Sequence, residues 1–154
     1  MIKHTWYSWN IKKQHINFLV KQIYARIYVK SQKKVVVVSK NNIKWQMPGW
    51  KPKNWENFNE TLNREIYEET SLKLEWKNPI LFWYYVVKEF DLEYLQLRYF
   101  VEISGIDENI LVPCENWDAD PILTVRLVNI DELSNFIPRL LDSWELKSFL
   151  EMLK

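Results

Sequence analysis

The chain has 154 residues, a length at which one domain can bury a hydrophobic core of its own. Hydrophobic residues make up 47% of the chain and charged residues 27%, which excludes intrinsic disorder, and the net charge of +1 gives no basic field that would draw in nucleic acid or an anionic membrane. We therefore expect a single domain over residues 1–154 that binds neither nucleic acid nor membranes.

The N-terminal segment and the cysteine content bear on the location of the protein. Residues 1–10 lack the continuous apolar core of a signal peptide, and no apolar run approaches the roughly 20 residues that cross a bilayer. Cys114 is the only cysteine, so the chain can form neither an internal disulfide nor a multi-cysteine metal site. We expect a cytoplasmic protein in which Cys114 is a structural or incidental thiol.

Strands are predicted in the first third of the chain. Residues 20–40 are rich in β-branched side chains, and the alternate residues from Ile23 to Val29 fall on one face. A second run, residues 35–38, follows a polar turn, so the two runs predict an antiparallel hairpin. A further short strand is expected over residues 43–47, where Pro48-Gly49 ends it and a loop begins.

A helix is predicted over residues 57–70. Phe58, Leu62 and Ile66 recur every four residues, as on the apolar face of an amphipathic helix. Asn57 stands at the N-cap position with Glu60 three residues later, which is the spacing of a capping box.

The remainder of the chain predicts further strands and then helices. β-Branched and aromatic residues favour strands over residues 72–76, 80–90, 95–103 and 122–128. Residues 131–154 carry two helical stretches separated near Pro138. Because repeated strand-helix-strand units are missing, this order indicates an α+β fold, a mixed α/β sandwich, and not a doubly wound sheet.

Three glutamates lie on one side of the predicted helix. At about 100° per residue, Glu65, Glu68 and Glu69 fall within an arc of about 100°. Arg64 can pair with Glu68 four residues on, but one arginine cannot neutralise three carboxylates. A magnesium ion, which prefers oxygen ligands, can do so. The simpler interpretation is a solvated acidic face, and the spacing alone does not decide between the two.

The residues around this helix resemble the Nudix box, G-x5-E-x7-R-E-U-x-E-E-x-G-U, in which U is aliphatic. Seven constrained positions agree in register, namely Glu56, Arg64, Glu65, Ile66, Glu68, Glu69 and Leu72. Met47-Pro48-Gly49 is similar to the apolar-Pro-Gly segment before the box, and residues 125–133 resemble the late strand and following helix of that family. The resemblance implies a Nudix fold, a mixed sheet flanked by helices, and favours the metal-binding interpretation of the glutamates.

Both glycines of the box are replaced, the first by Trp50 and the second by Ser71. Glycine serves where φ is positive or where the backbone approaches another group closely, and a tryptophan resists both. We therefore expect a reshaped loop at Trp50. The change at Ser71 is expected to be mild, because serine readily forms local hydrogen-bonded turns.

The resemblance implies a magnesium-dependent hydrolase, with Mn²⁺ as the alternative ion, that cleaves the diphosphate linkage of a nucleoside triphosphate or of another nucleoside diphosphate linked to X. Metal ions spread the charge that develops on phosphate and lower the pKa of bound water. Glu65, Glu68 and Glu69 would bind the metal and act in catalysis. Arg64 would orient a glutamate, and Glu56 would support the metal site directly or through water.

Further side chains are candidates for substrate binding and proton transfer. Lys51 stands where the family often carries lysine and is assigned, with Trp50, to substrate binding. Trp45 and the aromatic residues of 82–85 could also stack on a nucleobase, although most of them are expected in the core. The general base is either a box glutamate or an acid of the later loop, where the candidates are Glu115, Asp118 and Asp120. His4 and His15 are expected to be surface or packing residues.

Two other functions compete with the hydrolase. Because both box glycines are replaced, the alternative is a Nudix-fold module that senses a nucleotide without cleaving it. A protein-interaction domain with exposed tryptophans would show no effect of metal. The sequence leaves open the identity of X, the base and the oligomeric state, monomer or homodimer.

Overall fold

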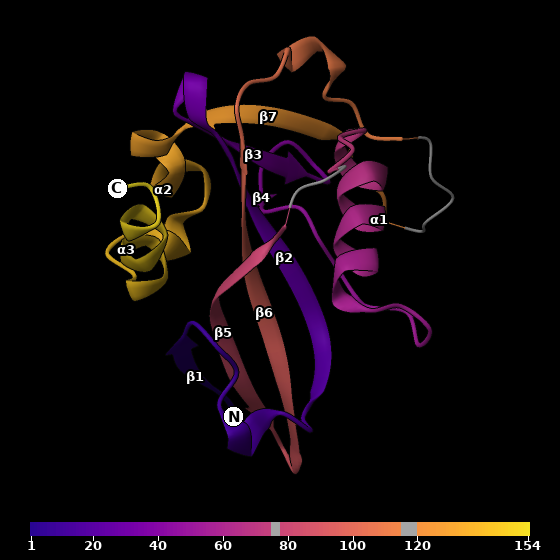
Figure 1. Ribbon diagram of the computed structural model, residues 1–154, viewed down its shortest axis with the longest axis vertical. Helices are drawn as coiled ribbons and strands as arrows, with labels where there is room; N and C mark the ends of the chain where they lie inside the picture. The colour runs from indigo at the N-terminus through magenta and orange to yellow at the C-terminus, as the bar shows by residue number, and fades with distance from the viewer. Residues whose placement is uncertain (75–77, 115–119) are drawn as a thin grey trace.

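The computed structural model describes residues 1–74, 78–114 and 120–154 (Figure 1). Its strands are β1 (Ile2–Ser8), β2 (Leu19–Val29), β3 (Lys34–Ser39), β4 (Trp45–Gln46), β5 (Ile80–Glu89), β6 (Leu92–Ile103) and β7 (Thr124–Asn129). Its α-helices are α1 (Phe58–Thr70), α2 (Leu133–Phe136) and α3 (Trp144–Glu151). Short 3-10 turns lie at Lys13–His15, Lys30–Gln32, Glu108–Ile110, Ile130–Glu132 and Pro138–Leu140.

Over the described residues, seven strands form one mixed sheet. Their order is β1-β5-β6-β2-β3-β4, and β7 pairs with β3. The long central strands β2 and β6 run parallel, whereas the other neighbours are antiparallel. The predicted hairpin of β2 and β3 is confirmed, with Tyr28 opposite Val35.

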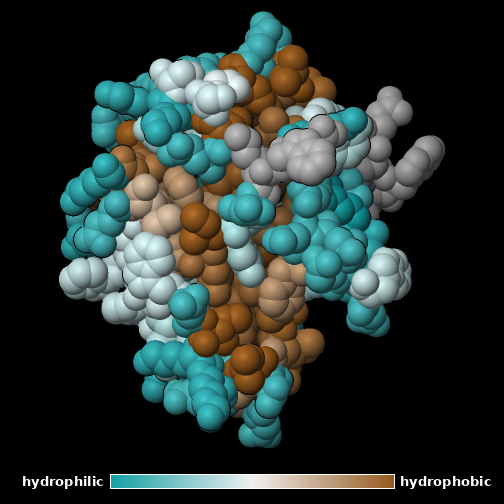
Figure 2. Space-filling model, viewed as in Figure 1, coloured by the Kyte–Doolittle hydropathy of each residue, from teal (hydrophilic) through white to brown (hydrophobic). Residues whose placement is uncertain are grey.

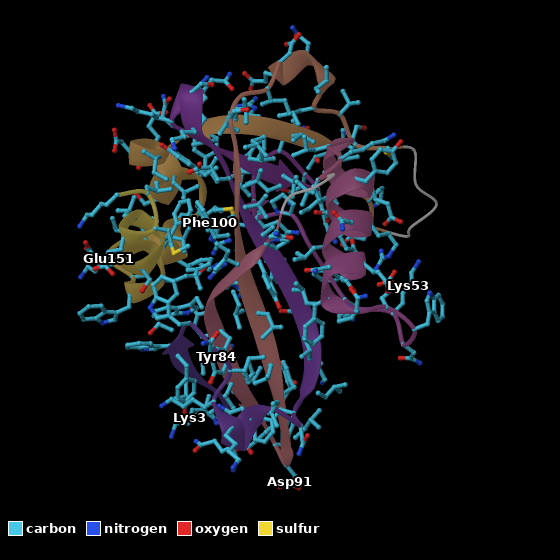
Figure 3. All side chains as sticks on the ribbon, viewed as in Figure 1. Lys3, Lys53, Tyr84, Asp91, Phe100 and Glu151 are labelled. Carbon is cyan, nitrogen blue, oxygen red and sulfur yellow. The ribbon has the colours of Figure 1, made fainter. Side chains whose placement is uncertain are left out.

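Helices cover both faces of the sheet, and alternation along the strands supplies a separate core to each face. On one face, Leu62 and Ile66 of α1 pack with Ile23 of β2. On the other, Phe149 of α3 packs against Phe100, which Figure 3 labels between the sheet and α3. Figure 1 shows α1 on one side of the sheet and α2 with α3 on the other. The predicted α+β sandwich is confirmed.

The capping box of α1 forms as predicted. The Asn57 side chain accepts a hydrogen bond from the backbone N–H of Glu60 (2.9 Å), and the Glu60 carboxylate accepts one from the N–H of Asn57 (2.8 Å). This reciprocal pair satisfies two donors that the first turn would otherwise leave free. It sets where α1 begins, and therefore how its glutamates face the preceding loop.

Two segments differ from the sequence prediction. The strand expected over residues 72–76 is wrong for the described residues 72–74, which follow a left-handed turn at Ser71 and are irregular, with Leu74 buried in the core. Residues 75 and 76 lie outside the described part. Conversely, the structure contains a strand, β1, that the sequence did not predict, because most of its side chains are exposed. This strand pairs along its whole length with β5.

The helices leave part of the sheet uncovered. In Figure 2, a strip of apolar surface runs down the middle of the lower half of the face shown, where Figure 1 shows strands without a helix in front of them. Leu19 and Leu92, at the starts of β2 and β6, are among the exposed large hydrophobic residues. No helix in the described ranges is long and apolar enough to cross a membrane. The α1 layer thus covers only the half of the sheet beside the box.

Candidate active site

The segment from Met47 to Trp50 runs along β2 and brings the box to the sheet. The carbonyl oxygens of Pro48 and Trp50 accept hydrogen bonds from the N–H groups of Ala25 and Ile23, both at 2.9 Å. Gly49 between them has φ of 128°, and a Cβ at this residue would lie 2.1 Å from the carbonyl oxygen of Ile23. The close backbone approach that requires glycine therefore occurs at Gly49.

Trp50 does not suffer the strain expected of it, because it is not among the residues with positive φ. The residue before it, Gly49, takes the conformation that a tryptophan would resist. The Trp50 ring is 36% exposed and lies under two ammonium groups, with Lys40 Nζ 4.7 Å and Lys51 Nζ 5.5 Å from its centroid. Trp50 and Lys51, both predicted to bind substrate, thus form an exposed cationic and aromatic rim together with Lys40.

Ser71 ends α1 in the left-handed conformation, with φ of 60°. That conformation costs a non-glycine residue roughly 1 kcal/mol. The Ser71 N–H donates to the carbonyl of Tyr67 (2.8 Å), and its hydroxyl donates to the carbonyl of Val112 (2.6 Å). The hydroxyl contact is with a distant segment and not with the local turn that we expected.

Arg64 lies at the centre of the box and contacts three of its glutamates. It binds Glu56 in bidentate fashion, from Nε to Oε1 (2.5 Å) and from Nη2 to Oε2 (2.9 Å). Its Nη1 donates to Oε1 of Glu65 (2.7 Å) and to Oε2 of Glu68 (3.2 Å). These charge-assisted bonds hold side chains of the loop and of α1 together. Glu69 is held from the other direction by the N–H of Gly49 (2.8 Å).

The electrostatics of these carboxylates differ. The Arg64 hydrogen bonds lower the pKa of Glu56 to about 2. Burial raises the pKa of Glu69 to about 8, the Gly49 N–H opposes this shift, and the nearby charges of Glu65 and Glu68 add to it. The raised pKa of Glu69 thus reflects burial and this crowding of carboxylates, since three other glutamates, Glu56, Glu65 and Glu68, already share the single Arg64 guanidinium.

The donor set suits a hard divalent cation, because it offers carboxylate oxygens that repel one another and have too few positive partners. Glu65 and Glu69 are buried, and the side chain of Glu68 is 33% exposed. As the side chains stand, no three acidic, histidine or cysteine side chains among the described residues are placed to hold a metal ion. Oxygens of Glu65 and Glu68 that an ion would use are instead paired with Arg64.

The other candidates lie around this cluster or apart from it. Asp120 is exposed and pairs with Lys40 at 2.7 Å, whereas Glu115 and Asp118 lie outside the described residues. His15 is a packing residue, with Nδ1 3.0 Å from the hydroxyl of Tyr84. Cys114 packs against the end of α1, where its N–H donates to the carbonyl of Glu68 (2.8 Å).

Most aromatic candidates for base stacking lie in the core. Phe82, Trp83 and Tyr84 are at most 2% exposed. Tyr85 instead lines a pocket of about 460 Å³ on the α2 and α3 face of the sheet. Trp45 lines a neighbouring pocket of about 490 Å³, where its ring contacts Phe136 edge-on.

A second charged cluster, which was not predicted, lies beneath the pocket of Tyr85. It joins Arg26 of β2, Arg98 of β6, Arg139 and Glu145 of α3. A signal was present in the sequence: Arg26 and Arg98 interrupt the apolar and aromatic runs 23–29 and 97–101. A charge at such a position has to be paired or to serve a ligand.

Comparisons with known proteins identify the fold. The sequence matches no model of a known protein family, and no curated protein matches it. Solved structures do match. The chain resembles a pyrophosphohydrolase of Bacillus subtilis, BsRppH, with a TM-score of 0.63 and 15% identity over 98% of this chain and 89% of that one.

Two further structures extend the comparison. An Ap4A hydrolase of C. elegans matches with a TM-score of 0.61 and 12% identity over 86% of this chain and 98% of that one. The NUDIX domain of Shewanella oneidensis NrtR, solved with ADP ribose, matches with a TM-score of 0.60 and 15% identity over 94% of this chain and 95% of that one. The chain therefore has the Nudix fold that its box motif implied.

Proposed function

We propose that the protein is a magnesium-dependent hydrolase that cleaves the diphosphate linkage of a nucleoside triphosphate or of another nucleoside diphosphate linked to X. The observation that carries this proposal is the gathering of four box glutamates, three around Arg64 and the fourth on the Gly49 N–H, where the C-terminal half of α1 faces the preceding loop. The structural neighbours support it, since they include proteins described as a pyrophosphohydrolase and an Ap4A hydrolase.

In this proposal Glu65, Glu68 and Glu69 hold the divalent ion. When bound, the ion supplies charge neutralisation at the phosphate and a lowered pKa for bound water. Arg64 keeps Glu65 and Glu68 adjacent through Nη1, and Glu56 fixes the Arg64 guanidinium by its bidentate contact. The Gly49 N–H orients Glu69 toward the loop. These contacts keep the carboxylates close together, and Glu65 and Glu68 would exchange their Arg64 contacts for those of the ion.

The rim beside the glutamates has the chemistry to receive the substrate. Lys51 and Lys40 are cations that attract phosphate, and the exposed aromatic ring of Trp50 beside them can stack on a base. We assign substrate binding to Lys51 and Trp50, with Lys40 as an additional contact.

The test is hydrolysis of a panel of nucleoside triphosphates and nucleoside diphosphate conjugates with Mg²⁺, followed by phosphate or pyrophosphate release. Wild type should turn over at least one compound, and Glu68→Gln and Glu69→Gln should each lower kcat by about 100-fold or more, because each removes a charged ligand. Glu60→Gln is the matched control. Glu60 is exposed on the same helix, and glutamine also serves in a capping box, so its kcat should stay that of wild type.

Two results would contradict the proposal. If all three variants lose activity alike, the loss reflects the helix and not the ligands. If wild type cleaves nothing while a nucleotide of the panel raises its Tm, the protein is a nucleotide sensor and not a hydrolase.

A further inference from the structure

The pocket of about 460 Å³ is built on cross-strand neighbours of β2, β6 and β5. Gln22 stands opposite Gln96, and Tyr24 stands opposite Arg98, in the parallel pairing of β2 with β6. Tyr85 of β5 is in turn opposite Gln96. Polar groups thus converge on a concave surface from three adjacent strands. We call this surface the arginine pocket.

Arg98 is the central side chain of the arginine pocket. It is 3% exposed, and its guanidinium lies 4.7 Å from the ring centroid of Tyr24 and 5.3 Å from that of Tyr85. Its Nη2 donates to Oε1 of Gln96 (3.2 Å), while Nε has no hydrogen-bond partner among the described residues. Two aromatic rings thus pack against the guanidinium, and its Nη1 donates to the carbonyl of Leu97 (3.2 Å).

The cluster beneath the pocket has an excess of positive charge. Arg26 and Arg98 both approach Oε1 of Glu145, with Arg98 Nε at 3.6 Å, and Arg139 Nη1 is 3.4 Å from Oε2. Tyr85 donates its hydroxyl to Oε2 as well (2.6 Å). Three guanidinium groups therefore share one carboxylate, and the described residues that line the pocket include no acid. Burial and the charge of Arg139 lower the pKa of Arg98 to about 10, as expected for cations with too few counter-charges.

The arginine pocket borders the box. Met47 lines the pocket, and two residues later the Gly49 N–H holds Glu69. Tyr24, on the pocket side, lies between Ile23 and Ala25, whose N–H groups bind the Pro48–Trp50 segment. The Met47 to Gly49 stretch therefore links the pocket, on the α2 and α3 face of the sheet, to the box glutamate Glu69.

We propose that the arginine pocket binds a phosphomonoester carried by the substrate, separate from the diphosphate that is cleaved at the box. This inference rests on the proposed function for the identity of the cleaved group. Arg98 and Arg139 are the phosphate partners, because guanidinium groups bind phosphate oxygens through paired, charge-assisted hydrogen bonds. Arg26 stays bound to Glu145. The bound phosphate supplies the negative charge that the buried cluster lacks.

The test uses two pairs of diphosphate compounds that differ only in a phosphomonoester: NADP⁺ with NAD⁺, and coenzyme A with dephospho-coenzyme A. Calorimetric titration without divalent ions measures binding with no hydrolysis. Wild type should bind the phosphorylated member of at least one pair more tightly by about tenfold or more, as one or two charge-assisted hydrogen bonds predict. Arg139→Gln should reduce that preference to about threefold or less. Arg139 is half exposed, so this variant avoids the folding risk of replacing Arg98.

The control is Arg126→Gln, which removes the same charge from an exposed residue of β7 outside the pocket and should keep the wild-type preference. Equal affinity within both pairs, including no binding by either member, would overturn the inference, as would a preference that survives Arg139→Gln. In the latter case the cluster serves folding only. Hydrolysis with Mg²⁺ is measured separately. If wild type prefers the phosphorylated compound, Arg139→Gln loses that preference and no compound is hydrolysed, the hydrolase proposal fails but the inference about the arginine pocket stands.

Discussion

The two charged clusters of the protein have opposite compositions, one arginine among glutamates and one glutamate among arginines. At the box, Glu56, Glu65 and Glu68 surround Arg64. On the other face of the sheet, three arginines surround Glu145. Each cluster has one residue of minority charge at its centre and an excess of the opposite charge around it.

The clusters differ in how they are exposed. The box cluster is open at two side chains, Glu68 (33% exposed) and Arg64 (20%), whereas the arginine cluster is closed except at Arg139 (53%), with Glu145 at 1%. A buried charge needs its partner more than an exposed one does. We infer that Glu145 is essential to stability, and that the box can exchange its central arginine contacts for those of an ion.

Removal of the central charge of the arginine cluster should have the largest effect. Glu145→Ala leaves Arg26 and Arg98 buried without a carboxylate, so the free energy of unfolding should fall by about 3–5 kcal/mol. Urea denaturation measures the change. Glu102→Ala is the control, because its exposed pair with Lys30 should be worth less than about 1 kcal/mol. Similar small losses in both variants would contradict the essential role of Glu145.

A substitution at Gly49, in the segment between the two clusters, should have the next largest effect on stability. Gly49→Ala drives a Cβ into the backbone of β2 and requires a positive φ, which should cost about 2 kcal/mol of stability or more. It should also reduce hydrolysis, since the Glu69 donor moves. In Gly105→Ala the new Cβ meets only the side chain of Ser31, with Oγ at 2.8 Å, and needs no positive φ, so the effect should be smaller. Equal unfolding energies for the two variants would contradict this account.

Acid should weaken the box cluster through Glu56. The folded-state pKa of Glu56, about 2, lies below its ordinary value of 4.5, so the unfolded chain takes up the proton first as pH falls. The stability of the pair is thus present above pH 4.5 and is lost between pH 4.5 and 2. With allowance for the partial exposure of Arg64, it should amount to about 1–2 kcal/mol.

Urea unfolding of wild type and Glu56→Gln at pH 7, 4.5 and 3 tests this prediction. The variant should be less stable at pH 7, and the difference should shrink toward pH 3. Parallel pH profiles would show that the Glu56 to Arg64 pair contributes nothing.

Mg²⁺ should have the smallest effect and should act on the box alone. At about five times its Kd, the ion should raise the free energy of unfolding by about 1 kcal/mol. Thermal unfolding should show a rise in Tm for wild type and Glu60→Gln, and little rise for Glu68→Gln. An equal rise in all three would place the ion elsewhere.

The sequence by itself determined the parts of the structure that depend on neighbouring residues. Helix α1 and its capping box were predictable because their contacts join residues three or four apart, and the β2 and β3 hairpin because its strands alternate across a short turn. The box spacing likewise marked Arg64 and its glutamates. By contrast, β1 was not predictable from its exposed side chains, and Leu74 is in the core without belonging to a strand.

Only the tertiary structure decided where the close backbone approach falls and which charges meet. The need for glycine at Gly49 arises from its contact with Ile23 on β2, which no local pattern contains. The charged cluster around Glu145 joins residues from β2, β6, α3 and the turn before α3, up to 119 positions apart between Arg26 and Glu145. Their meeting depends on the parallel register of β2 with β6 and on the packing of α3 against the sheet, and local periodicity specifies neither.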